Sequence, residues 1–74
     1  MSAILRDEMG SEFKIKPERK EEIRSLFLMN KRLKEGRDWK IKEKDGKMVL
    51  EVGNMDSKTK WAFKQAMLMA GMME

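Results

Sequence analysis

The chain has 74 residues, with 17 Lys and Arg against 13 Asp and Glu, which gives a formal net charge of +4. A chain of this size forms one domain of marginal stability, and its basic balance favours an anionic partner. It contains no Cys and no His, which excludes disulfides and thiolate or imidazole metal sites. Since there is no secretion signal and no apolar run of roughly 20 residues, we expect a cytoplasmic protein that does not enter a membrane.

Residues 1–11 carry a short apolar patch, Ala3 to Leu5, among polar residues. No periodic pattern commits them to a helix or a strand. We therefore predict a flexible or frayed N-terminal arm over residues 1–11, followed by a single domain over residues 12–74.

Apolar and basic residues alternate over residues 13–16, which is the pattern of a half-buried strand. Pro17 ends this strand and suits the first turn of a helix, where its missing N–H has no intrahelical acceptor. The helix is expected to stop at Gly36, a residue that adopts left-handed backbone angles easily. Its apolar side at helical spacing comprises Ile23, Leu26, Phe27, Asn30 and Leu33.

The stretch from Trp39 to Val52 predicts a β-hairpin. Asp45-Gly46 is a favoured pair for a two-residue type I′ turn, because both central residues of that turn need positive φ. This turn fixes the register, which runs from Lys44 opposite Lys47 to Trp39 opposite Val52.

The hairpin register separates two faces. The core face holds Trp39, Ile41, Met48, Leu50 and Val52, and the other face holds Lys40, Lys42, Lys44 and Lys47 with Val49 and Glu51. Alternation along each strand therefore collects the lysines on one side of the sheet.

A second helix is predicted from an Asp56 or Ser57 cap to about Ala70, with Gly71 as its stop. Its broad apolar face comprises Ala62, Phe63, Ala66, Met67, Met69, Ala70 and Met73. A second apolar stripe of Trp61, Leu68 and Met72 lies on the far side. This stripe packs either within the monomer or against a partner chain.

These elements predict an α+β fold in the order β-α-β-β-α, with about three strands in one layer and both helices on one face of the sheet. The uncovered face would carry the lysines.

Catalytic motifs are missing from this pattern. A nucleophilic triad usually needs His as its base, and the five glycines are isolated, so they form no phosphate-binding loop. The acidic pair Glu21-Glu22 is better explained by the positive end of a helix dipole. We expect no enzyme, catalytic residue, metal, cofactor or small-molecule substrate.

Two functional hypotheses remain. The first is a small regulatory protein that binds the phosphates of DNA or RNA through Lys14, Lys16, Lys40, Lys42, Lys44 and Lys47. Lysines on an open sheet also protect its edge from pairing, however, and no aromatic residue interleaves with them.

The alternative is a protein-interaction module or inhibitor that docks on a larger enzyme or transcription complex through Trp61, Leu68 and Met72. The two hypotheses are compatible, because a homodimer formed through the second helix could present two lysine faces to one duplex.

Overall fold

Four strands form one mixed sheet in the computed structural model, which describes residues 2–74. The strands are β1 (Ser2–Arg6), β2 (Glu12–Lys14), β3 (Trp39–Lys44) and β4 (Lys47–Val52), in the order β2-β1-β4-β3 across the sheet. The central strands β1 and β4 are parallel, and each pairs with its edge strand in antiparallel fashion. The predicted α+β class is confirmed, with one strand more than the three expected.

The β3–β4 hairpin has the predicted register. Asp45 and Gly46 have φ angles of 53° and 74°, so both central residues of the turn have the positive φ that a type I′ turn requires. All six cross-strand pairs, from Lys44 with Lys47 to Trp39 with Val52, are those expected from the sequence.

The N-terminal segment is not an arm. Residues 2–6 form β1, which lies between β2 and β4 with Ala3 and Leu5 buried in the core. The Asp7 carboxylate accepts hydrogen bonds from the backbone N–H groups of Met9 and Ser11, which closes the turn into β2. The prediction of an arm over residues 1–11 is therefore wrong for β1; Met1 lies outside the described residues.

The first helix is shorter than predicted. A short 3₁₀ turn (Pro17–Arg19) leads into α1 (Lys20–Leu28), which ends eight residues before Gly36. Side chains in the next segment bind backbone groups that a continuing helix would need. Asn30 accepts a hydrogen bond from the N–H of Arg32, and Asp38 accepts one from the N–H of Lys34. Such local bonds favour turns over helix.

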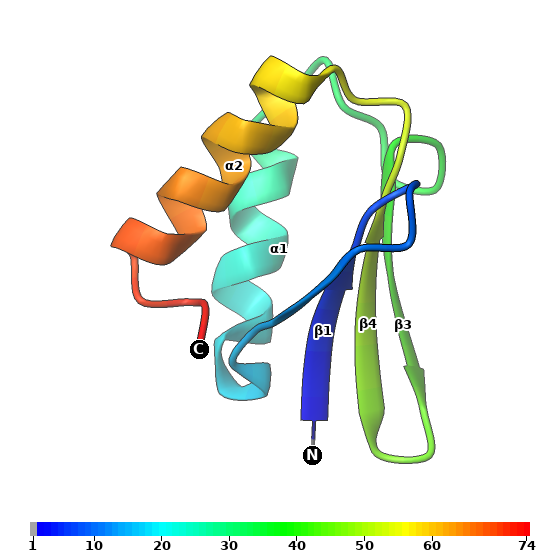
Figure 1. The fold of residues 1–74 in the computed structure, drawn as a ribbon, viewed down its shortest axis with the longest axis vertical. Helices are drawn as coiled ribbons and strands as arrows, with labels where there is room; N and C mark the ends of the chain where they lie inside the picture. The colour runs from blue at the N-terminus through cyan, green and yellow to red at the C-terminus, as the bar shows by residue number, and fades with distance from the viewer. Residues whose placement is uncertain (1) are drawn as a thin grey trace.

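The second helix, α2 (Ser57–Met69), begins as predicted. The Asp56 carboxylate accepts a 2.6 Å hydrogen bond from the N–H of Thr59, which caps the helix. Gly71, at φ 72°, reverses the chain, and the N–H of Met72 then binds the carbonyl oxygen of Met67. Both helices cover the same face of the sheet (Figure 1).

The core lies between this helical layer and the sheet. Phe27 of α1 stacks on Phe63 of α2 with ring centroids 4.4 Å apart, and it also contacts Trp39 of β3 at 5.4 Å. The largest fully buried side chains are Trp39, Phe27, Ile15, Ile23, Met48, Leu50 and Met67. Within residues 2–74, neither helix has the length and apolar character needed to cross a bilayer.

Candidate nucleic-acid interface

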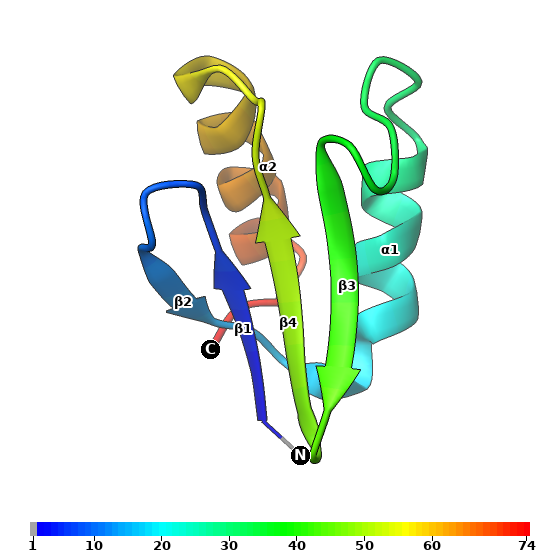
Figure 2. The ribbon, with the colours of Figure 1, turned by 90° about the vertical axis from the view of Figure 1, so that its right-hand side faces the viewer.

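The outer face of the sheet has no helix over it. Figure 2 looks onto this face, with α1 and α2 behind the strands. Successive side chains of a strand point to opposite faces, so Leu50 and Val52 of β4 are buried beneath the helices while Val49 and Glu51 point outward. The outer face is therefore open to a partner.

Strand register brings basic residues from all four strands onto this face. Lys14 of β2 aligns through Ile4 and Val49 with Lys42 of β3. A second row contains Arg6 and Lys40, and a third contains Lys44 opposite Lys47. We call this face the basic sheet surface; its charged members are Arg6, Lys14, Lys40, Lys42, Lys44, Lys47, Glu12 and Glu51. Six basic and two acidic residues give it a net charge of +4.

Glu51 lies at the centre of the surface among three cations. Its carboxylate is 3.1 Å from the Lys42 amine, 3.8 Å from that of Lys40 and 3.9 Å from the Arg6 guanidinium. The hydrogen bond from Lys42 is the largest cause that lowers the Glu51 pKa, and the charges of Lys42, Lys40 and Arg6 lower it further. Glu51 is therefore ionised at neutral pH and competes with any anion for these cations.

The hairpin end of the surface is different. Lys44 and Lys47 face each other across the turn, and neither forms an ion pair with any of residues 2–74. Lys14, at the opposite edge, is likewise exposed and unpaired in this part of the chain. These three lysines are the cations most available to an anionic ligand.

The basic sheet surface lacks one of the basic residues predicted from the sequence and contains one that was not predicted. Lys16 lies beyond the end of β2, half-buried, where its backbone N–H binds the carbonyl oxygen of Met72, so it does not share the sheet register. Arg6 was missed because β1 was not recognised as a strand. The sequence signal for β1 was weak, because the apolar Ile4 between Ala3 and Leu5 obscures the alternation of inner and outer positions.

The predicted protein-binding stripe on the second helix is divided. Trp61 and Leu68 are 63% and 57% exposed on α2. Met72, in contrast, is 7% exposed and belongs to the core, because the chain reverses at Gly71 and folds it back toward Leu26 and Met29 of the α1 region. The inclusion of Met72 in an exposed stripe is therefore wrong.

No group of acidic side chains in the described residues is arranged to hold a metal ion. Comparisons with protein-family models, with curated proteins and with solved structures found no match.

Proposed function

We propose that this protein is a small, non-enzymatic regulatory protein that binds nucleic acid by contacting phosphates through its basic sheet surface. The observation that carries the proposal is the uncovered outer face, where six basic residues from four strands meet only two carboxylates. Clustered cations attract the phosphate backbone and release its counterions on binding.

The chemistry of the surface favours contact with the backbone over contact with bases. Lysine provides a compact point charge, which binds phosphate without distinguishing one base from another. The apolar residues among the lysines are Ile4 and Val49, and neither has an aromatic ring on which a base could stack. We expect binding with little sequence preference.

Glu51 sets the strength of the interaction. A phosphate that approaches Lys40 or Lys42 must replace or share the Glu51 carboxylate, whereas Lys14, Lys44 and Lys47 carry no such partner in residues 2–74. The affinity should therefore be moderate and strongly dependent on salt.

A second candidate function is docking to a larger enzyme or transcription complex through Trp61 and Leu68. The supporting observation is their exposure at positions seven residues apart on one flank of α2. If such docking is the function, Leu68→Glu should preserve the far-UV circular dichroism spectrum and abolish complex formation, while leaving nucleic-acid affinity unchanged.

Fluorescence anisotropy with labelled duplex DNA and duplex RNA of mixed sequence tests the first proposal. Neutralising three to four phosphates predicts a slope of about −3 to −4 in log affinity against log salt on duplex DNA. Similar affinity for unrelated sequences is also expected. No detectable binding at low salt would overturn the proposal and leave the lysines as a surface that protects the sheet edge.

A further inference from the structure

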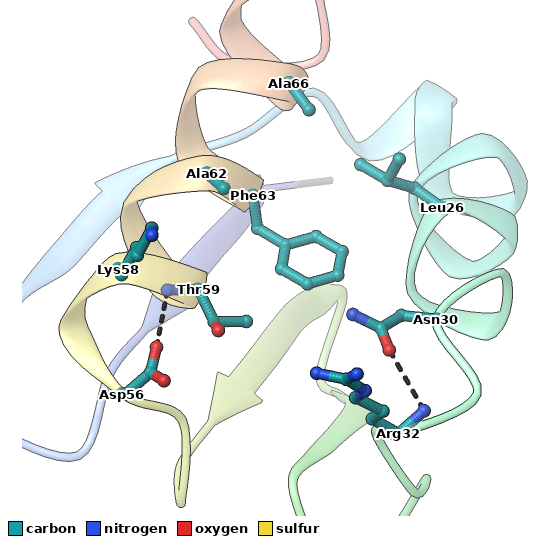
Figure 3. A pocket seen from close by; sticks show the side chains of 9 residues that line it. All are labelled: Leu26, Asn30, Arg32, Asp56, Lys58, Thr59, Ala62, Phe63 and Ala66. Atoms are coloured by element: carbon teal, nitrogen blue, oxygen red, sulfur yellow. Dashed lines mark hydrogen bonds between the residues drawn. The ribbon is translucent and has the colours of Figure 1, made fainter.

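An apolar groove separates the two helices on the side of the molecule opposite the basic sheet surface. Its larger section, about 540 Å³, lies between Leu26 of α1 and Ala62, Phe63 and Ala66 of α2. Figure 3 shows Leu26 and Phe63 facing each other across this section, with Arg32 at one end. We call the whole feature the interhelical groove.

A second depression adjoins the first at Leu26 and lies toward the start of α1, between this helix and the chain that follows α2. It has a volume of about 380 Å³, shares Leu26 with the first section, and is lined further by Met29, Met72 and the acidic residues Glu21 and Glu22. Met29 is 78% exposed here, and methionine adapts its shape to a packing partner. An exposed apolar groove on so small a domain is typical of an interaction surface.

The two ends of the interhelical groove carry opposite charge. Glu21 and Glu22 lie at one end; Glu22 is paired with Arg19, whereas Glu21 forms no ion pair within residues 2–74. Arg32 and Lys58 lie at the other end, where they too have no ion-pair partner in the described chain. Asp56, which lines the same section, caps α2 and interacts with the charge of Lys58, so the positive charge at this end comes mainly from Arg32.

This polarity makes the groove complementary to itself. In a twofold dimer each residue that contacts a partner residue is contacted in return by its equivalent. A twofold axis near Leu26 would place the acidic end of each copy against the basic end of the other and cover Met29 from both. We propose that the interhelical groove is the interface of a homodimer, with Glu21 of each protomer opposite Arg32 of its partner.

Such a dimer would have a consequence for ligand binding, which rests on the proposed nucleic-acid function. Because both helices cover the face of the sheet opposite the basic sheet surface (Figures 1 and 2), the two basic sheet surfaces would point away from each other. This geometry differs from the dimer expected from the sequence, in which both lysine faces met one duplex. The dimer proposed here would instead bind two separate nucleic-acid segments, one on each basic sheet surface.

Sedimentation equilibrium of the full chain without nucleic acid tests the dimer independently of that function. The wild type should show twice the 8.8 kDa mass of the chain at high micromolar concentration. Met29→Glu should yield monomers, because it places a charge in the apolar interface. Leu28→Glu is the matched control: Leu28 is 54% exposed but does not line the groove, so this variant should remain dimeric.

A charge exchange tests the pairing even if Met29→Glu perturbs the fold. Glu21→Arg and Arg32→Glu should each raise the dimer Kd by about tenfold, since each creates two repulsive contacts per dimer. The double variant should restore the wild-type Kd, while Glu18→Arg, outside the groove, should not change it. A monomeric wild type, equal effects of the Met29 and Leu28 variants, or a double variant weaker than both single variants would overturn the proposal.

Discussion

The inner and outer faces of β4 differ in burial and charge, although both are formed by one strand of six residues. Met48, Leu50 and Val52 are buried beneath the helices, whereas Val49 and Glu51 look outward among lysines. The difference shows how strand alternation lets one short segment both hold the core together and display a charged surface. Changes on the inner face should therefore alter stability, and changes on the outer face should alter binding.

The largest effect is expected on the inner face. Leu50→Ala should lower the free energy of unfolding by about 2 to 5 kcal/mol, because it leaves a cavity in a close-packed core. Val49→Ala, one residue away on the half-buried outer face, should cost about 1 kcal/mol or less. Urea unfolding followed by far-UV circular dichroism measures both changes. If both variants lost the same free energy of unfolding, the inner and outer faces of β4 would be equally buried, which would contradict the fold.

On the outer face, the double variant Lys42→Gln with Lys44→Gln should weaken nucleic-acid binding. Its slope of log affinity against log salt should be shallower by roughly two units, because two phosphate contacts are lost. The thermal transition should move little, since exposed charges contribute little to stability.

Lys31→Gln with Lys34→Gln provides the matched control for charge. Both residues are exposed in the segment after α1 and lie outside the basic sheet surface. This control should retain the wild-type slope. If the two double variants behave alike, binding depends on net charge and not on the sheet.

Glu51→Gln should have smaller effects, which differ in direction: affinity for nucleic acid should rise, and stability should fall. Removing this carboxylate frees Lys40 and Lys42, while Arg6 keeps its ion pair with Glu12, so affinity for duplex DNA should rise by about threefold at low salt. Stability at neutral pH should fall by less than about 1 kcal/mol, because the ion pairs are partly exposed. An unchanged affinity would show that phosphates do not reach the centre of the surface.

The pH dependence of this stability difference follows from the lowered pKa of Glu51. Since the folded pKa lies below the ordinary glutamate value of 4.5, the ionised side chain stabilises the fold above that pH. The contribution is lost as the pH falls through the lowered pKa. Wild type and Glu51→Gln should therefore differ in urea midpoint at pH 7 and converge in acid.

The hairpin was predictable because its information is local. Asp45-Gly46 fixes the turn, and unbroken alternation on either side then determines every cross-strand pair. The start of α2 was predictable for a similar reason, since the Asp56 cap acts on a backbone group only three residues away.

β1 could not be predicted in the same way. Its pairing with β4 is parallel and joins residues more than forty positions apart, so no local turn motif predicts this pairing. Ile4 on the outer face also hides the alternation of Ala3 and Leu5. The missing strand removed Arg6 from the candidate site and made residues 1–11 look like an arm.

Met72 was misplaced because helical periodicity does not extend past a chain reversal. Gly71 turns the chain at positive φ, after which the carbonyl oxygen of Met72 accepts a hydrogen bond from the N–H of Lys16. The reversal folds Met72 back toward Leu26 and Met29, where it joins the core. The hydrogen bond ties Lys16, which lies beyond the end of β2, to the C-terminal segment.

NMR titration of the labelled protein with a short duplex tests the central claim most directly. The account predicts that the backbone amide and side-chain amine signals of Lys14, Lys42, Lys44 and Lys47 shift most, while the backbone amide signals of Trp61 and Leu68 on α2 stay in place. The shifts should weaken together as salt is added. Shifts confined to α1 and α2, or the absence of any shift at low salt, would contradict the assignment of nucleic-acid binding to the basic sheet surface.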